Sequence, residues 1–151
     1  GEWFYGIEKP RVIVEKYLSN DDGSTLFDYK FMCFNGEPKL MYVNTRKDNT
    51  HHLNVYDTEF NPIPGVKLGY ENDLETQVNK PDNFDKMLEY ARILSRPFLH
   101  VRVDFYNVNG KIVFGELTFT KSAGFGKIEP HSFDVMMGSW IKLPVRQGST
   151  I

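Results

Sequence analysis

Short stretches in which apolar and polar side chains alternate recur along the chain, and this period of two is typical of β-strands. Six stretches follow the pattern, at residues 11–17, 26–34, 40–45, 53–56, 98–106 and 111–120. Turn-forming segments rich in Asn, Asp, Gly and Pro lie between several of them, at residues 20–24, 35–38, 61–65 and 109–110. The pattern therefore predicts a mostly antiparallel sheet.

Strong helical periodicity occurs once. Apolar residues that would share one face of a helix recur at intervals of three or four positions: Phe84, Met87, Leu88, Ala91 and Leu94. Pro81-Asp82 is a typical helix start and Arg96-Pro97 a typical end, so we predict a helix over residues 82–95. A shorter helix is predicted over residues 131–140. The expected fold class is α+β, a mostly antiparallel sheet with one long helix.

Composition narrows the class of protein. With 151 residues, 40% of them hydrophobic and 25% charged, the chain is expected to form a single domain over residues 1–151. The net charge of -2 and the scattered Lys and Arg residues argue against a nucleic-acid-binding protein. No apolar run reaches the roughly 20 residues that span a bilayer. The single cysteine, Cys33, favours a reducing, cytoplasmic location.

The segment 98–120 carries the most informative charges. Apolar residues occupy the odd positions of its two strand interiors, whereas the even positions include Arg102, Asp104 and Glu116. Two carboxylates beside a guanidinium on one face would suit Mg²⁺ and phosphate oxygens. A solvated ion pair between Arg102 and Glu116 explains the same pattern without a ligand, and the pattern alone leaves both interpretations open.

The turn between these two strands decides whether the charges share a face, because a one-residue slip in register turns every side chain of a strand over. A two-residue turn at Asn109-Gly110 would place Glu116 opposite Val103, on the apolar face. Burying an unpaired carboxylate there costs several kcal/mol. We therefore predict a three-residue turn over residues 108–110, which places Arg102 opposite Glu116.

Other residues with metal-binding or reactive side chains give weaker evidence of a functional site. His51 and His52 are adjacent on a predicted strand and so point to opposite faces, which prevents a shared metal ion unless the strand bulges. Cys33 alternates with apolar neighbours and is interpreted as a packed thiol. The Gly-rich segment 124–127 lacks the Gly-Lys-Ser/Thr ending of a phosphate-binding loop.

Four segments of the chain occur in a characteristic order: RVIVEKYL at residues 11–18, DYKFMCFNG at residues 28–36, VRVDFYNVNG at residues 101–110 and FGELTF at residues 114–119. Together they resemble the TupA-like ATP-grasp family, which is associated with bacterial cell-surface polysaccharide synthesis. The resemblance extends over most of the chain, from about residue 2 to residue 144. The resemblance implies the C-terminal part of an ATP-grasp catalytic region that uses ATP and Mg²⁺.

The resemblance also implies roles for the charged residues of the hairpin. Asp104 and Glu116 would hold Mg²⁺ at the ATP phosphates. Arg102 would stabilise negative charge on the transferred γ-phosphoryl group or on the resulting acyl phosphate.

The resemblance implies that residues between positions 15 and 30 bind the nucleotide. The stretch containing Glu15, Lys16 and Leu18 resembles an adenine-binding hinge whose backbone groups contact the purine edge. Asp28 would accept hydrogen bonds from the ribose hydroxyls, and Lys30 would approach a phosphate or the substrate.

The sequence departs from the family pattern in three places. Thr118 stands where ATP-grasp enzymes usually have a metal-binding Asn, and the usual Pro-Gly turn is replaced by Lys121-Ser122-Ala123-Gly124. The Lys-bearing, Gly-rich loop that covers the phosphates in this family would lie before Gly1, where the sequence has no initiator Met. We therefore interpret the chain as a partial ATP-grasp fold from a longer protein, and expect it to bind ATP weakly and to turn over little on its own.

By resemblance, the parent enzyme is a ligase that activates a carboxylate as an acyl phosphate, which an amine or another nucleophile then captures. Its substrate would be a polysaccharide, a uronate or an amino acid. Two other classes remain open. A metal-dependent glycosyltransferase would carry an Asp-x-Asp pair at a strand end, and a non-catalytic carbohydrate-binding module would present an exposed aromatic platform.

Overall fold

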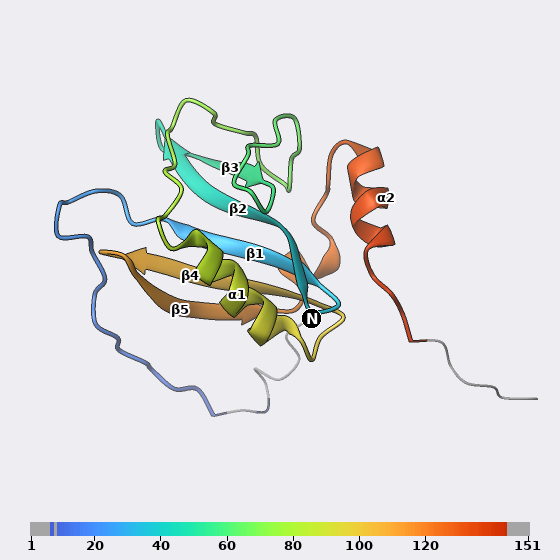
Figure 1. The fold of residues 1–151 in the computed structure, drawn as a ribbon, viewed down its shortest axis with the longest axis horizontal. Coiled ribbons are helices and arrows are strands. Elements are labelled where there is room, and N and C mark those ends of the chain that lie inside the picture. The colour runs from blue at the N-terminus through green and yellow to red at the C-terminus, as the bar shows by residue number, and fades with distance from the viewer. Residues whose placement is uncertain (1–6, 8, 145–151) are drawn as a thin grey trace, which may run out of the picture.

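The computed structural model describes residue 7 and residues 9–144. Within this part of the chain, the sheet has five strands in the order β3-β2-β1-β4-β5, and every neighbouring pair is antiparallel (Figure 1). The strands are β1 (Asp28–Phe34), β2 (Glu37–Lys47), β3 (Thr50–Tyr56), β4 (His100–Val108) and β5 (Lys111–Thr118). The predicted α+β class with an antiparallel sheet is confirmed.

Two α-helices and one short 3₁₀ helix accompany the sheet in the described residues: α1 (Phe84–Ser95), α2 (His131–Ser139) and η2 (Lys121–Gly124). Both helical segments expected from the sequence form, and α1 begins two residues later than predicted. The expectation of one long helix is not confirmed, because α1 has 12 residues and α2 has 9. Neither described helix combines the length and the apolar character that a membrane crossing requires.

The predicted strand at residues 11–17 is wrong, because this segment has no regular secondary structure. Val12, Ile13 and Val14 are 93%, 81% and 90% exposed, so consecutive side chains face solvent on both sides of the segment. An alternating apolar pattern forms a strand only where it gains a paired neighbour and a half-buried face. Among the residues that the structure describes, this segment has neither.

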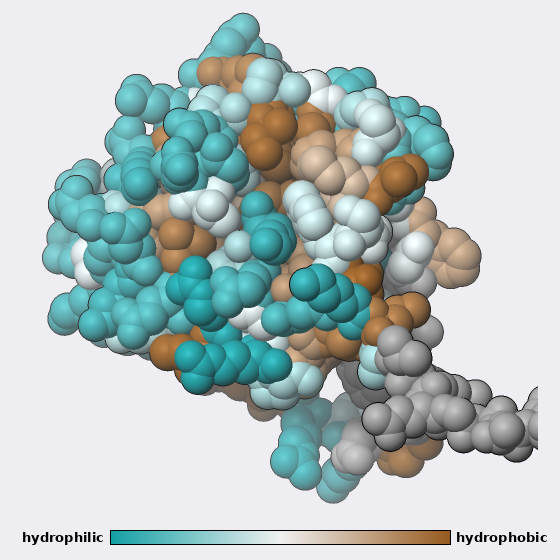
Figure 2. Space-filling model, turned by 45° about the vertical axis from the view of Figure 1, so that its right-hand side comes forward, coloured by the Kyte–Doolittle hydropathy of each residue, from teal (hydrophilic) through white to brown (hydrophobic). Residues whose placement is uncertain are grey.

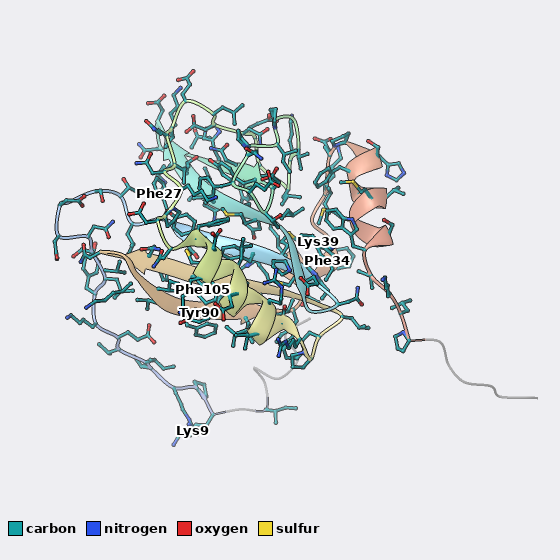
Figure 3. The ribbon with its side chains drawn as sticks, in the orientation of Figure 1. Lys9, Phe27, Phe34, Lys39, Tyr90 and Phe105 are labelled. Carbon is teal, nitrogen blue, oxygen red and sulfur yellow. The ribbon has the colours of Figure 1, made fainter. Side chains whose placement is uncertain are left out.

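The two faces of the sheet support separate apolar cores. Side chains alternate along a strand, so the odd positions of β1 face α1 and the even positions face α2. On the first face, Phe31 and Phe105 pack against Phe84 of α1, and Phe105 lies beneath that helix (Figure 3). On the second face, Phe34 and Met137 belong to one apolar cluster.

Apolar side chains reach the surface mostly as separate patches among hydrophilic ones on the face shown in Figure 2. The large core residues are enclosed between sheet and helices, and Phe31, Phe84 and Met87 have almost no exposed surface. Lys30, Arg102 and Asp104 lie on the same α2 side of the sheet, where Tyr42 of this second core contacts Arg102.

The turn between β4 and β5 is shorter than predicted. Val108 pairs with Lys111, so the turn has only two residues, Asn109 and Gly110. Both have positive φ angles, 49° and 76°. Positive φ at both positions is the geometry that matches the twist of a hairpin and that Asn-Gly favours. The predicted three-residue turn is wrong, because this local preference decides the turn.

A β-bulge further along the hairpin changes the register. Phe105 pairs with Phe114, whereas Val103 pairs with Leu117, so two residues of β5 lie opposite the single residue Asp104. One extra residue on one strand reverses which side chains share a face beyond it. With the two-residue turn alone, Glu116 would share a face with the apolar side chains. The bulge moves Glu116 to the face that carries Arg102 and Asp104.

The bulge gathers the three charges on the α2 face although the predicted pairing is wrong. Arg102 lies opposite Thr118 rather than opposite Glu116. Arg102 nevertheless donates hydrogen bonds to both Asp104 and Glu116. Nearer the turn, Ile112 packs against the α1-side core, so the assignment of every even position of β5 to the polar face is wrong there.

Gly115, one of the two bulge residues, is expected to resist substitution. A Cβ at this position would lie 3.1 Å from the backbone oxygen of Asp104 and 3.4 Å from the Asp104 Cβ. Gly115→Ala should therefore lower the free energy of unfolding by about 1–3 kcal/mol, because the hairpin must open at the charged cluster. Thermal and urea unfolding would measure this change.

Gly138→Ala in α2 is the matched control, because no atom outside the adjacent helical backbone lies within 4 Å of its added Cβ. Alanine at this helical position should raise stability by about 0.5–1 kcal/mol. Equal stability of Gly115→Ala and the wild type would show that the bulge is not tightly packed.

Candidate functional site

Five charged side chains from β1, β4 and β5 form one connected network, which we call the charged cluster: Asp28, Lys30, Arg102, Asp104 and Glu116. The Lys30 ammonium lies between two carboxylates, donating to Asp28 and, over 2.6 Å, to Asp104. The Arg102 guanidinium donates to both oxygens of Asp104, each over 2.7 Å, and to Glu116. Three carboxylates and two cations leave a formal charge of -1 in the cluster.

The cluster is assembled by register between β1 and β4. Lys30 pairs with Asp104, and Met32 pairs with Arg102. Cross-strand neighbours on one face stand about 5 Å apart, which is why Lys30 and Asp104 meet. The glycine at position 115 allows the β5 backbone to approach Asp104 closely enough for Glu116 to join them.

Burial sets the protonation behaviour of the cluster. Asp104 is 1% exposed and Lys30 is 7% exposed. Burial raises the pKa of Asp28 by more than the Lys30 ammonium lowers it. Burial by itself would lower the pKa of Lys30, but its hydrogen bonds to Asp104 and Asp28 raise it above the usual value. Lys30 is therefore a fixed cation between the two carboxylates.

A groove of about 830 Å³ opens beside the charged cluster, and its size lies within the range of small-molecule sites. Asp28, Asp104 and Glu116 line one part of it. Glu15, Lys16 and Leu18 line another part, together with Tyr106, Val113, Phe114 and Gly115. Six of the eight site residues predicted from the sequence thus surround one groove. Lys30 and Arg102 reach it through the carboxylates that they bind.

The irregular segment before β1 is tied to the tip of the β4–β5 hairpin. The backbone N–H of Asp21 donates to the Asn109 side chain over 2.9 Å, and the backbone N–H of Asn109 donates to the Asn20 side chain over 3.2 Å. This pair of contacts explains how residues 15–18 come to lie at the groove although they form no strand. The N-terminal end of α1 is attached to the same turn, through the bond from Asn83 to the Gly110 carbonyl.

One oxygen of the cluster lacks a partner. Asp28 Oδ1 is buried and accepts no hydrogen bond from any residue that the structure describes. A buried acceptor without a donor is costly, and Asp28 lines the groove. A hydroxyl or N–H group of a bound ligand would satisfy this atom.

The donor set fits a Mg²⁺ ion that shares its coordination with a ligand. The described residues contain no group of three His, Cys, Asp or Glu side chains able to hold a metal ion by themselves. Asp104 and Glu116 supply hard oxygen donors, and Mg²⁺ is commonly bound by one or two carboxylates together with substrate phosphates and water. Each carboxylate offers about four acceptor positions, so both retain capacity beyond their bonds to Arg102 and Lys30.

Tyr42 and Lys121 belong to the same neighbourhood and were missed by the sequence analysis. The Tyr42 hydroxyl accepts a hydrogen bond from Arg102 Nη1 over 3.1 Å. The Lys121 ammonium lies 4.8 Å from the centre of the Tyr42 ring and donates to the Leu68 carbonyl over 2.7 Å. Tyr42 pairs with Lys30 across β1 and β2. The alternation of β2 could have placed Tyr42 on this face, but no sequence signal indicated the position of Lys121.

Among the remaining chemical candidates, Thr118 contacts the charged cluster, whereas His51, His52 and Cys33 line no part of the groove. Thr118, which replaces the usual metal-binding Asn, donates to Glu116 over 3.1 Å. His51 contacts Arg46, and His52 lies next to it on β3. Cys33 is fully buried, and burial raises the pKa of its thiol to about 11, as expected of a packed, unreactive thiol.

An antiparallel sheet that carries an Arg–Asp–Glu cluster beside a ligand-sized groove, with Asp104 buried and Glu116 exposed, is consistent with an ATP-grasp protein. The comparison with protein families agrees. A model of the TupA-like ATPgrasp family matches residues 3–142, nearly the whole chain, and the protein belongs to this family. The comparisons with curated proteins and with solved structures each gave no match.

Proposed function

We propose that this chain is the metal- and nucleotide-binding part of an ATP-grasp ligase that activates a carboxylate at the expense of ATP. The convergence of Asp28, Asp104, Glu116 and the 15–18 segment on one groove carries the proposal, and the family membership supports it. The chain is then a partial ATP-grasp fold.

Each side of the groove has a distinct proposed role. Backbone groups of Glu15, Lys16 and Leu18 bind the adenine. Asp28, whose Oδ1 lacks a donor, accepts a hydrogen bond from a ribose hydroxyl. Asp104 is then left at the phosphate end, next to the cations.

At the phosphate end of the groove, the proposed role of the charged residues is to stabilise the negative charge of the ATP phosphates. Asp104 and Glu116 would hold Mg²⁺, and the ion would supply positive charge at the ATP phosphates. Arg102 is held by Asp104, Glu116 and Tyr42, so its positive charge is fixed before the reaction begins. Preorganised charge of this kind stabilises the phosphoryl-transfer transition state without rearrangement.

The proposed reaction is acyl-phosphate formation. A carboxylate oxygen of the donor substrate attacks the γ-phosphorus of ATP, and the bond from that phosphorus to the β–γ bridging oxygen breaks. ADP leaves with the electron pair of this bond. An amine or another nucleophile then displaces phosphate from the acyl phosphate. By resemblance to the family, we assign the reaction to cytoplasmic steps of cell-surface polysaccharide synthesis, with a polysaccharide, uronate or amino-acid substrate.

Calorimetric titration of this chain with ATP tests the proposal. We expect weak but saturable ATP binding that requires Mg²⁺ and disappears with EDTA, and no binding of UDP-glucose. Glu116→Gln should weaken ATP binding about tenfold or more, because even residues that only support metal ligands commonly contribute that much. Glu89→Gln on the exposed surface of α1 is the control and should not change the affinity.

Binding of UDP-glucose without binding of ATP would overturn the proposal in favour of a glycosyltransferase. Binding of a uronic-acid oligosaccharide that is insensitive to Asp104 and Glu116 substitutions, with no ATP binding, would favour a carbohydrate-binding module.

A further inference from the structure

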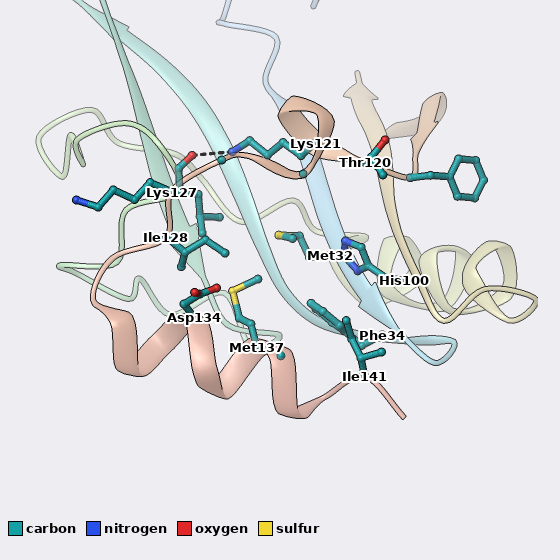
Figure 4. A pocket seen from close by; sticks show the side chains of 15 residues that line it. Met32, Phe34, His100, Thr120, Lys121, Lys127, Ile128, Asp134, Met137 and Ile141 are labelled. Carbon is teal, nitrogen blue, oxygen red and sulfur yellow. Dashed lines mark hydrogen bonds between the residues drawn. The ribbon is translucent and has the colours of Figure 1, made fainter. Parts of the chain in front are cut away.

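A second cavity lies on the α2 side of the sheet, beyond the charged cluster, and has a volume of about 380 Å³ (Figure 4). Its walls come from β1, α2 and the segment that links β5 to α2. Most of its lining is apolar, with Met32, Phe34, Leu68, Phe119, Met137 and Ile141 among the residues that contribute. The polar groups are few, and the two that matter most are His100 and Lys121.

His100 presents a hydrogen-bond acceptor to this cavity. Its Nδ1 lies 3.0 Å from the backbone oxygen of Cys33. A carbonyl oxygen only accepts, so Nδ1 must carry the proton, and Nε2 of the neutral ring is left with a free lone pair. Nε2 has no hydrogen-bond partner among the described residues, and it is not among their fully buried polar atoms that lack a partner. Burial lowers the pKa of His100, which favours the neutral ring.

The imidazole is held in place as well as oriented. Its ring lies over the ring of Phe34, with a centroid separation of 4.6 Å. His100 precedes Arg102 by two residues on β4, so both side chains project from the same face of the sheet. The lone pair of Nε2 is thus available on the side of the sheet where the charged cluster lies.

Lys121 supplies a cation to the same cavity. One of its three N–H groups is used by the Leu68 carbonyl, and the ammonium lies against the Tyr42 ring (Figure 4 shows the bond to Leu68). Donor capacity therefore remains for an anion. Burial, assisted by the charges of Arg102 and Lys30, lowers the pKa of Lys121 to about 8. A bound carboxylate would offset both effects.

The cavity adjoins the charged cluster through Tyr42. The Tyr42 hydroxyl bonds to Arg102, and its ring lies under the ammonium of Lys121. Lys121 on the cavity wall is thus linked to Arg102 of the charged cluster through the single side chain of Tyr42. Two other titratable residues, Lys127 and Asp134, also line the cavity.

We propose that this cavity binds the nucleophile of the ligase reaction and that the nucleophile is an apolar α-amino acid. The carboxylate of the amino acid binds Lys121, its side chain packs against the apolar walls, and its amine donates to His100 Nε2. An amine, a carboxylate and an apolar body match the acceptor, the cation and the lining that the cavity offers. The assignment rests on the proposed function, because the cavity alone does not define a reaction.

The amine of the bound amino acid forms an amide with the acyl phosphate. The amine nitrogen attacks the carbonyl carbon of the acyl phosphate and forms a C–N bond. The bond between that carbon and the phosphate oxygen breaks, and inorganic phosphate leaves with its electron pair. Before the attack, the ammonium group of the bound amino acid gives one proton to the unprotonated Nε2 of His100, which frees the nitrogen lone pair. The second proton, lost as the amide forms, leaves with the phosphate. The product is an amide.

Calorimetric titration of the whole chain with three probes tests this inference: L-leucine, N-acetyl-L-leucine, which has no basic amine, and L-leucine amide, which has no carboxylate. We expect L-leucine to bind. His100→Asn should weaken L-leucine and L-leucine amide about tenfold and leave N-acetyl-L-leucine almost unchanged. Lys121→Met should weaken L-leucine and N-acetyl-L-leucine about tenfold and spare L-leucine amide. Charged hydrogen bonds commonly account for changes of this size.

His131→Asn and Lys111→Met are the matched controls, because both residues are exposed and line no part of this cavity. Their binding should equal that of the wild type, and thermal unfolding should show that all four variants are folded. The probe-specific pattern separates direct contact from a structural effect, because a distorted cavity would weaken all three probes equally.

Each other result overturns a defined part of the inference. Failure of L-leucine to bind the wild type, while ATP binds with Mg²⁺, overturns the amino-acid site and leaves the proposed function intact. Equal weakening of all three probes by His100→Asn overturns its role as the acceptor of the amine proton. Binding of L-leucine without any binding of ATP overturns the proposed function, and with it the assignment of the amino acid as the nucleophile. Tighter binding of L-glutamate than of L-leucine overturns the apolar selectivity.

Discussion

Asp104→Asn should abolish magnesium-dependent ATP binding and lower the free energy of unfolding by about 3–5 kcal/mol. Asp104 is almost fully buried and accepts hydrogen bonds from Arg102 and Lys30. Asparagine keeps the shape but removes the negative charge, so two cations lose their shared partner. For a chain of this length, the change corresponds to a fall in the melting temperature of about 10 °C.

Differential scanning calorimetry and ATP titration measure the two effects separately. Asp48→Asn is the matched control, because Asp48 is exposed at the β2–β3 turn with a φ of 49°, a conformation that asparagine tolerates. Unchanged ATP affinity in a folded Asp104→Asn protein would contradict the assignment of Asp104 to the metal. Unchanged stability would show that the network contributes no net energy.

Lys30→Met is expected to cost a similar amount of stability, about 3–5 kcal/mol, because it leaves Asp28 and Asp104 without the cation that separates them. Methionine preserves most of the apolar stem, so the loss reports on charge rather than packing. Added Mg²⁺ should restore part of the stability, because a divalent cation can neutralise the same carboxylates. Thermal unfolding with and without Mg²⁺ would measure the recovery.

Lys39→Met provides the comparison for this prediction. Lys39 is exposed on β2, so its replacement should leave the melting temperature nearly unchanged and insensitive to Mg²⁺. A Lys30→Met protein that gains no stability from Mg²⁺ would argue that the carboxylates are not accessible to a metal ion.

Local patterns predicted most of the fold. The alternation at residues 26–34 and 98–106 predicted β1 and β4, and the apolar spacing from Phe84 to Leu94 predicted α1. These patterns succeed because each element buries one face, and burial favours the same residue spacing that reveals the element. The same alternation at residues 11–17 predicted a strand that does not form, because in the described part of the chain this segment has neither a partner strand nor an apolar surface to pack against.

The hairpin shows a different limit of sequence reasoning. Requiring Glu116 to avoid the core was physically sound, and Glu116 does lie with Arg102. The chain meets that requirement with a bulge beside Gly115 rather than with a longer turn. Both solutions shift the register by one residue, so the pattern of charges alone could not distinguish them. The preference of Asn109-Gly110 for a two-residue turn was the signal that favoured the bulge.

The candidate site was predictable where its residues are close in sequence or share a familiar motif. Arg102, Asp104 and Glu116 come from one hairpin, and the family resemblance supplied Asp28 and Lys30. The positions of Tyr42 and Lys121 depend on pairing between β1 and β2 and on the path of the chain after β5. The alternation of β2 assigns Tyr42 to a face of its strand but does not show which residues of β1 and β4 it meets, and local periodicity contains no information on the position of Lys121.

The division of β1 between two helices has a practical consequence for protein engineering. Tyr29, Phe31 and Cys33 point to one layer of the molecule, whereas Asp28, Lys30, Met32 and Phe34 point to the other. A library that varies only Asp28 of the second set would change the groove while both apolar cores and Lys30 continue to hold the strand in place. Randomising both sets together would also disrupt the packing of β1 against α1, and with it the stability of the fold.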